Sequence, residues 1–380
     1  MVGADHADFI WSLVGSYLKL NMAKNRSLLN KKAWLVSLII TLTFLGILFV
    51  FDASVAESFH TFGDQYHFLK QHLAWAVIGI TVMFLTSLVP LSLWEKVAKP
   101  IFIFGLILLI LVFVPGIGRE FNGAHRWIFL GNLRFQPIEL FKIALIMFFA
   151  SWLKQHQKTL PFLFTTGVPA ILILLQPDLG SLLILGVIAF GMFFIAGGKM
   201  THILSISGLT ILLLAVAILS SSYRRERLNT FLHPQSDPLG SGFHIRQITL
   251  ALGRGGATGQ GIGNSRQKFS YIPEASTDSI FAIIAEEVGF LGSSILIILF
   301  GSYFFVTSKI ISAVTDPFVM LLGWGILIWI AAQTLLNLAA VVALVPLTGL
   351  PLPFISYGGS SLVTILFANG ILLRIAKEYN

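Results

Sequence analysis

The chain has 380 residues, of which 56% are hydrophobic and only 11% charged, and its mean hydropathy is +0.86. This composition lies far outside the range of soluble domains and indicates an integral membrane protein. The absence of cysteine excludes disulfides, thiolate catalysis and cysteine-ligated metals, and the nine histidines lack metal-ligand spacing. Without a Walker or dinucleotide motif, we expect no nucleotide cofactor and no nucleic-acid ligand, while a divalent cation stays open.

Residues 1–32 form a basic segment ahead of the apolar part of the chain. They lack the continuous apolar run and the small-residue cleavage site of a signal peptide. Ile10, Leu13, Val14, Tyr17 and Leu18 recur at helical spacing. This spacing favours a cytoplasmic helix on the inner membrane surface, and a poorly ordered extension is the alternative.

Apolar runs then recur to the C-terminus, and about 20 helical residues cross the hydrocarbon core. We predict about ten spans, at 33–51, 72–88, 101–114, 141–153, 162–175, 179–196, 203–219, 280–306, 318–344 and 362–375. Helices are expected because lipid offers no water to bond backbone groups. The predicted fold class is an all-α polytopic membrane protein with one transmembrane domain over 33–380 and a large outer loop, 221–277, between spans seven and eight.

Lysine and arginine in short loops favour the cytoplasm, so the basic residues before the first span place the N-terminus inside. Ten spans return the C-terminus to the same side. Two basic loops are then outside, at 116–137 and 221–277. Their cations are Arg119, Arg126, Arg134, Arg224, Arg225, Arg227, Arg246, Arg254, Arg266 and Lys268. An anionic, phosphate-bearing substrate would explain this charge, with lipid phosphates or mere solubility as the alternative.

Polar residues inside the predicted spans give further candidates, because such groups usually face a protein interior or a wet cavity. Glu139 and Lys142 lie three residues apart and share a helix face, either for function or as an ion pair that fixes packing. Asp178 has either a functional role in a cavity or a structural role as the N-cap of the following helix. Gln333 and Asn337, at i and i+4, are more typical of interhelical hydrogen bonds than of ligands.

Asp278 stands just before the apolar run that begins at Ile280. A carboxylate held at a membrane boundary is a candidate general base. Ser276, Thr277 and Asp278 also have the chemistry of helix N-caps, so a capping role is the competing interpretation.

The ordered set of motifs resembles the SEDS family of polytopic membrane proteins, which includes FtsW, RodA and SpoVE, from about residue 33 to residue 375. The matching segments are Arg126-Trp127, Arg134-Phe-Gln-Pro-Ile-Glu-Leu-Phe-Lys142, Gln176-Pro-Asp-Leu-Gly180, Asp237-Pro-Leu-Gly-Ser-Gly-Phe-His244, Thr277-Asp278, Ala285-Glu-Glu-Val-Gly289 and Gly349-Leu-Pro-Leu-Pro-Phe-Ile-Ser-Tyr-Gly-Gly-Ser-Ser361. Trp329, Gln333 and Asn337 favour the FtsW-like branch, whereas Phe51-Asp-Ala-Ser54 departs from its usual form.

The resemblance implies a polymerase that joins lipid II into β-1,4-linked peptidoglycan strands on the outer membrane face. The acceptor GlcNAc 4-hydroxyl attacks the anomeric carbon of an undecaprenyl-pyrophosphate-linked glycan with inversion, and Asp278 matches the family's essential acid and serves as base. We expect Arg126, Arg134, Lys142, Arg225 and Arg227 to face pyrophosphate. Glu139 would orient Lys142, and Asp178 would assist in the cavity.

The resemblance also implies a class B penicillin-binding protein transpeptidase and other divisome proteins as partners in the bacterial inner membrane. A RodA-like elongation polymerase, a lipid II flippase and a scaffold without chemistry are the alternatives. A flippase would keep partial activity when Asp278 is neutralised, and a scaffold would tolerate its loss.

Overall fold

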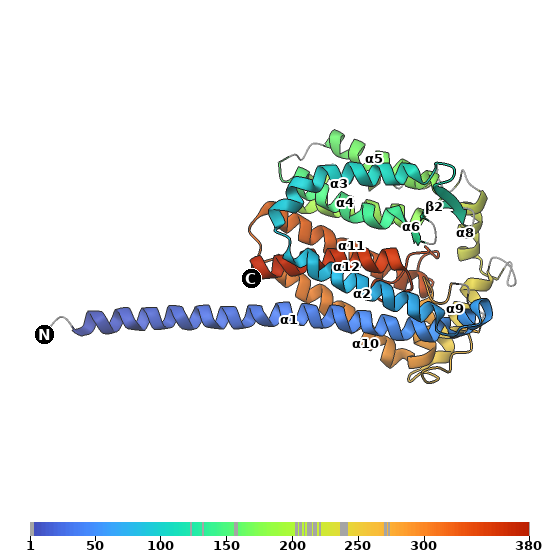
Figure 1. Ribbon diagram of the computed structural model, residues 1–380, viewed down its shortest axis with the longest axis horizontal. Coiled ribbons are helices and arrows are strands. Elements are labelled where there is room, and N and C mark those ends of the chain that lie inside the picture. The colour runs from blue at the N-terminus through green and yellow to red at the C-terminus, as the bar shows by residue number, and fades with distance from the viewer. Residues whose placement is uncertain are drawn as a thin grey trace.

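The computed structural model of the protein is a bundle of long helices that run roughly along one direction (Figure 1). It describes residues 4–379 apart from 122–123, 131–132, 156–158, most of 202–221, 236–241, 270–271 and 273, and for residues 4–30 it describes the backbone alone. The predicted span 203–219 therefore lies largely outside the described residues.

Helices dominate the described chain. They are α1 (Ala4–Phe62), α2 (His67–Leu88), α3 (Leu91–Leu111), α4 (Pro137–Leu153), α5 (Thr159–Leu175), α6 (Leu179–Ile195), α8 (Ser222–Leu232), α9 (Phe243–Gly255), α10 (Ile280–Ile311), α11 (Pro317–Val341) and α12 (Gly359–Glu378). Helix α1 is continuous through residues 4–30, and Figure 1 shows its first part extending beyond the bundle.

Five helical segments in the described part of the chain are long and apolar enough to cross a membrane. They are Lys31–Phe62, His67–Leu88, Ile280–Ile311, Pro317–Val341 and Gly359–Glu378, and α5 and α6 are shorter apolar helices. The chain is therefore a mostly helical, multi-pass membrane protein.

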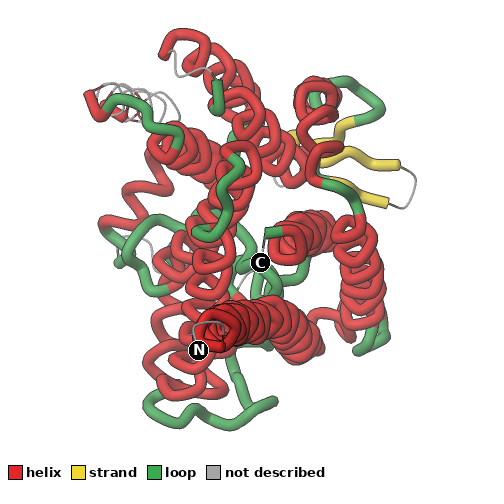
Figure 2. Tube along the Cα trace, turned by 90° about the vertical axis from the view of Figure 1, so that its left-hand side faces the viewer, coloured by secondary structure: helices red, strands yellow, loops and turns green. Residues whose placement is uncertain are grey.

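A small antiparallel sheet, which the sequence did not predict, lies between α3 and α4. Its strands are β1 (Gly118–Phe121), β2 (Ala124–Leu130) and β3 (Leu133–Phe135), paired in the order β1-β2-β3. Viewed along the bundle, the sheet lies at the edge of the helices (Figure 2). Because Arg134 belongs to β3 and α4 begins two residues after this strand, the sheet places that arginine directly ahead of α4.

Helix α4 lies at the centre of the fold, where it packs against α3, α6, α11 and α12. Most of its residues are buried, including two charged ones, Glu139 and Lys142. A helix that is apolar nearly all round is expected in such a position. Pro137 suits the first position of α4, since the N–H that proline lacks has no partner within a helix there.

Helices α2 and α12 approach each other closely because small residues lie between them. A Cβ atom added to Gly370 would lie 2.5 Å from the carbonyl oxygen of Met83. Without a hydrophobic driving force between helices in lipid, such close backbone packing is a main source of association.

Helix α10 is interrupted at Gly289, where φ is +66°. The break frees backbone groups that the loop after α9 then satisfies. Four hydrogen bonds join the two segments: Gln260 N to Glu286 O (3.0 Å), Gly261 N to Glu287 O (3.0 Å), Phe290 N to Gly256 O (2.9 Å) and Leu291 N to Ala257 O (3.0 Å). The loop is thereby fixed to α10 along its backbone, as buried polar groups require.

Candidate active site

Asp278 lies in the turn immediately before α10, and neighbouring elements hold the backbone of this turn. Its carbonyl oxygen accepts a hydrogen bond from Asn337 Nδ2 of α11 at 2.8 Å. The carbonyl oxygen of Ser276 accepts the N–H of Tyr357 at 2.9 Å. Since both contacts go to the backbone, they fix the position of the turn and leave the Asp278 carboxylate available.

The start of α10 does not use Asp278 as a cap. The N-cap residue is Ser279, and within the described chain no side chain caps the first N–H groups of α10. The Ser279 hydroxyl instead lies 2.8 Å from Nε2 of His244 on α9. The capping interpretation therefore does not describe this carboxylate.

Asp278 is partly buried, and its surroundings change the acidity of its carboxyl group. Burial, followed by the nearby Glu274 charge, raises the pKa of Asp278 to about 7, against smaller lowering effects from its own backbone N–H, from Arg227 and from Thr277. A general base works best when its pKa lies near the operating pH. Asp278 has that property at neutral pH.

Arg227 and His244 complete one side of the site. Arg227 of α8 is partly buried, and its charge acts on both Asp278 and His244. Burial and this charge lower the pKa of His244 to about 4, so the imidazole is neutral at pH 7. Arg225, two residues earlier on α8, is exposed, and side chains at i and i+2 point in different directions.

Arg134 reaches the same region through Tyr357. Burial raises the pKa of Tyr357, while the charge and hydrogen bond of Arg134 act in the opposite direction. The Tyr357 hydroxyl donates to Oε1 of Gln71 on α2 at 2.5 Å. Since the Tyr357 backbone also holds Ser276, the structure brings Arg134, Arg227 and Asp278 into one neighbourhood.

Glu139 and Lys142 lie deeper, between α4 and α11. Lys142 Nζ is 2.7 Å from Glu139 Oε1 and 2.9 Å from Gln333 Oε1, and it lies 5.0 Å above the ring of Trp329. These fully buried contacts match an ion pair that fixes packing. The pair reaches the site indirectly: Gln333 Nε2 donates to Pro351 O at 2.9 Å, and Asn337, one turn later, donates to Leu350 O at 2.7 Å.

Arg126 and Asp178 pair at the start of α6. Asp178 is the N-cap of α6 and accepts the Ser181 N–H at 3.0 Å and the Ser181 hydroxyl at 2.8 Å. Arg126 Nε donates to Gln176 O at 3.2 Å and lies 4.0 Å from the Asp178 carboxylate. The capping role weighed for Asp178 is thus present, and Arg126 contacts the turn that precedes α6.

A second charged cluster links α1, α10 and the loop between α9 and α10. Lys268 Nζ lies 2.8 Å from Asp52 Oδ1 and 3.0 Å from Glu287 Oε1. Burial lowers the pKa of Lys268, but hydrogen bonds and charge from both acids together raise it. Ser265 donates its N–H to Glu287 at 3.1 Å and its hydroxyl to Glu286 at 2.5 Å.

The sequence prediction counted Lys268 among the outer-loop cations that could face an anionic substrate, and it gave Asp52, Glu286 and Glu287 no role; in the structure Lys268 pairs with two of these acids instead. Two adjacent glutamates inside an apolar helix are themselves a signal, because buried acids need partners. Their partners could not be assigned from the sequence, since Asp52 and Lys268 are separated by 216 positions. In the part of the chain that the structure describes, no group of three or more His, Asp or Glu side chains could hold a metal ion.

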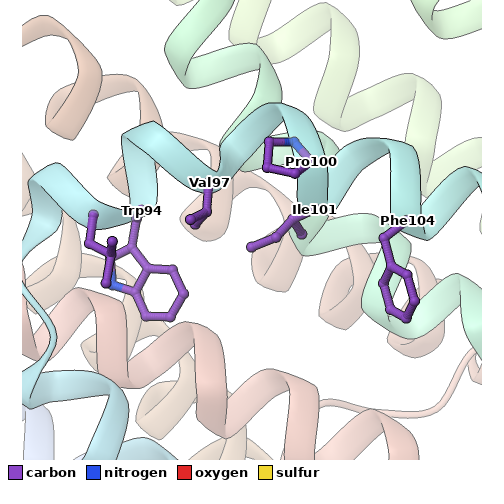
Figure 3. A pocket seen from close by; sticks show the side chains of 6 residues that line it. Trp94, Val97, Pro100, Ile101 and Phe104 are labelled. Atoms are coloured by element: carbon purple, nitrogen blue, oxygen red, sulfur yellow. The ribbon is translucent and has the colours of Figure 1, made fainter.

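An apolar groove of about 450 Å³ runs along α3 and is lined by Leu93, Trp94, Val97, Pro100, Ile101 and Phe104 (Figure 3). It starts beside the far end of α2, whose other end contacts Tyr357 through His72. The groove is therefore remote from Asp278, and its lining offers no carboxylate or cation for chemistry.

Comparison with known proteins places these features in context. The chain matches the FtsW/RodA/SpoVE family, described as "Cell cycle protein", over residues 33–380. It is 37% identical to stage V sporulation protein E of Bacillus subtilis over 90% of this chain and 96% of that protein. It is 38% identical to a probable peptidoglycan glycosyltransferase FtsW of Geobacter sulfurreducens over 89% of this chain and 93% of that protein.

Solved structures of two other proteins are also similar to this chain over most of its length. A chain from a study of the structural coordination of polymerization and crosslinking by a peptidoglycan synthase complex superposes with a TM-score of 0.77 at 29% identity, over 91% of this chain and 97% of that chain. The rod shape determining protein RodA of Thermus thermophilus superposes with a TM-score of 0.67 at 28% identity, over 91% and 96% of the two chains.

Proposed function

Because the chain belongs to the FtsW/RodA/SpoVE family, we propose that it is a peptidoglycan glycosyltransferase whose general base is Asp278. The observation that carries the assignment of the base is the uncapped carboxyl before α10, whose pKa is about 7. Contacts from α11 to the Asp278 backbone and from the loop before α12 to the Ser276 backbone support it, because they hold the turn in place.

The reaction is a single displacement. The 4-hydroxyl of an acceptor GlcNAc gives its proton to Asp278 while its oxygen bonds to the anomeric carbon of the donor glycan. The bond from that carbon to pyrophosphate breaks, and undecaprenyl pyrophosphate leaves with the electron pair. One base and a stabilised leaving group are sufficient for inversion, as in inverting glycosidases.

The cations fall into two groups in this proposal. Arg134 and Arg227 are the first candidates for binding the pyrophosphate because they lie around the Asp278 turn. Arg225 contributes from its exposed position on α8. Arg forks match phosphate oxygens well. Lys142, which is paired with Glu139, contacts Gln333, and Asp178 with Arg126 orders the start of α6. These four residues therefore support the site from behind.

The proposed topology has about ten spans with both termini in the cytoplasm, residues 1–32 inside and the loop 221–277 outside. The five long apolar helices and the two shorter ones in the described part of the chain support a multi-pass arrangement. Similarity to a chain of a peptidoglycan synthase complex that couples polymerization to crosslinking supports a class B penicillin-binding protein as partner. Relatives named FtsW favour a role in division with other divisome proteins over RodA-like elongation.

The function can be tested with purified protein, its transpeptidase partner and labelled lipid II. The Asp278→Asn variant should keep the shape of the side chain and lose the base, which lowers the rate of polymerisation by about 10²–10⁴-fold. Glu226→Gln, which removes an exposed acid from α8, is the matched control and should polymerise normally.

Long glycan strands made by Asp278→Asn at the wild-type rate would falsify the assignment of the base. A lipid II flippase would give a different result: no polymer from any variant, and lipid II movement that survives neutralisation of Asp278.

A further inference from the structure

We propose that Glu274 is a positioning residue for Asp278 and that the Thr277 hydroxyl bridges the two carboxylates. The inference rests on the proposed role of Asp278 as general base. It assigns roles to Glu274 and Thr277 in the turn 274–279, where the sequence prediction named Asp278 as the base and weighed Ser276, Thr277 and Asp278 as helix caps.

The Thr277 hydroxyl lies between the two acids. Its Oγ1 atom is 2.8 Å from Glu274 Oε2 and 3.5 Å from Asp278 Oδ1. A hydroxyl has one proton and donates it well to one acceptor at a time, so the shorter contact directs it to Glu274. From Thr277 the Asp278 carboxylate has only the long contact, and it gains little stabilisation from this neighbour.

The backbone of Glu274 supports a dedicated role. Its φ is +52°, a conformation that residues other than glycine rarely adopt. In this conformation its carbonyl oxygen accepts the N–H of Thr277 at 3.1 Å and that of Ser279 at 3.3 Å. Glu274 therefore shapes the turn and also aims its carboxylate at the Thr277 hydroxyl. Strained residues of this kind concentrate at functional sites.

Charged groups on the surrounding elements affect the titration of Asp278. Asp278 faces the Glu274 carboxylate and the Arg227 guanidinium of α8, and Glu274 in turn faces Glu57 of α1. His244 of α9 has a pKa of about 4 and is neutral at pH 7. Arg134 acts on Tyr357 beside the turn. The pKa of Asp278 is about 7, so this carboxyl titrates in the neutral range.

The charge of Glu274 determines in which direction its removal shifts the pKa of Asp278. The negative charge of Glu274 raises the pKa of Asp278, so removing that charge lowers it. A glutamine at position 274 still offers its amide oxygen to the Thr277 hydroxyl, so the shift in this variant reports the lost charge. A base with a lower pKa is deprotonated at lower pH but accepts a proton less readily, so its maximal rate falls.

The test is the pH dependence of polymerisation between about pH 5.5 and 9, measured on the full-length chain with its transpeptidase partner and lipid II. Glu274→Gln should move the half-maximal pH downwards by about half to one unit and lower the plateau about two- to threefold. Glu226→Gln should give the wild-type profile, which controls for titration of the substrate and for the loss of one acid.

Two further variants separate charge from positioning. Glu274→Asp keeps the charge but is one methylene too short to hold Thr277, so the half-maximal pH should stay near the wild-type value while the plateau falls. Thr277→Val removes the bridge and keeps both acids, and it should lower the plateau without a downward shift. Both variants keep a carboxylate at position 274. They therefore also test the proposal if Glu274→Gln fails to accumulate in the membrane.

The inference is overturned if Glu274→Gln shows the wild-type profile, or if Glu274→Asp and Thr277→Val both reach the wild-type plateau. Asp278→Asn, run in parallel, separates the two claims. An inactive Asp278→Asn with an unmoved Glu274→Gln profile removes the role of Glu274 alone, whereas an active Asp278→Asn removes the base itself.

Discussion

Asp178 and Asp278 both precede an apolar helix, and a difference of one position gives them different roles. Asp178 is the N-cap of α6, and its carboxylate accepts two hydrogen bonds from Ser181. Asp278 lies one residue before the N-cap of α10, too early to reach the free N–H groups. Its carboxylate therefore stays poorly stabilised and basic, which is the condition that general-base catalysis requires.

This basicity should cost stability. The pKa of Asp278 is about 7 in the folded protein and 3.8 in the reference state, so between these values the folded state binds a proton that the unfolded state releases. Stability contributed by the neutral carboxyl is thus lost as pH rises from about 4 to 7. Asp278→Asn should raise the melting temperature by a few degrees at pH 8. Thermal unfolding in detergent at pH 8 and at pH 4 measures this, and an equal difference at both pH values would contradict it.

The two arginines of α8 should differ in their effect on substrate binding. Arg227 is partly buried beside Asp278, whereas Arg225 is exposed and its charge is screened by salt. Arg227→Gln should weaken lipid II binding about tenfold, or ~1.4 kcal/mol, and flatten its salt dependence, and Arg225→Gln should do less. Titration with lipid II at low and high salt checks the ranking. Equal, small effects would move the anion site to Arg134 and Arg126.

At the scale of elements, α10 depends on its break at Gly289 and on the loop fixed to it. The backbone φ of Gly259 is positive, and a Cβ atom added to this residue would lie 2.0 Å from the carbonyl oxygen of Glu287. Gly263 has a similar φ of +86°, but a Cβ atom there would meet nothing within 4 Å. These two glycines separate the cost of the backbone conformation from the cost of the loop–helix contact.

We predict that Gly263→Ala costs about 1 kcal/mol, the conformational penalty alone. Gly259→Ala should cost about 1–3 kcal/mol more because the loop must move away from α10. Limited proteolysis of the loop 256–268 and thermal unfolding report the difference. Identical behaviour of the two variants would mean that the loop does not depend on this contact.

The contact between helices α4 and α11 also supports the site. Lys142→Met should destabilise the fold by about 3–5 kcal/mol because Glu139 is left charged and buried without its partner. Combining Lys142→Met with Glu139→Leu should restore the amount of folded protein, as measured by gel filtration in detergent. Restored polymerisation in the double variant would confine the pair to packing, and restored folding without activity would place Lys142 at the substrate.

At the scale of the whole molecule, the two ends of the bundle should face different compartments, with Glu226 of α8 outside and Lys96 of α3 inside. The natural absence of cysteine makes this easy to measure, since a single introduced thiol is the only one in the chain. A membrane-impermeant maleimide should label Glu226→Cys on intact spheroplasts. It should label Lys96→Cys, an exposed position on α3, only after the membrane is opened. The reverse pattern would overturn the proposed orientation.

Local properties of the chain were sufficient for the membrane class, for the start of α10 at Ile280 and for Gln333 and Asn337 as hydrogen-bond partners, because composition and helical spacing are properties of neighbouring residues. They were not sufficient for α3, which begins at Leu91 rather than near residue 101. Glu95, Lys96 and Lys99 lower the hydropathy of this segment without preventing a helix.

Tertiary structure decided which charges meet. Lys268 pairs with Asp52 across 216 positions, and Asn337 holds the backbone of Asp278 across 59. Such pairs depend on which helices pack together, and that depends on close contacts such as Gly370 against Met83 that no local pattern contains. The identity of the base could thus be proposed from the sequence, whereas the burial that raises its pKa depends on the tertiary packing around the turn, including the contact with Asn337 of α11.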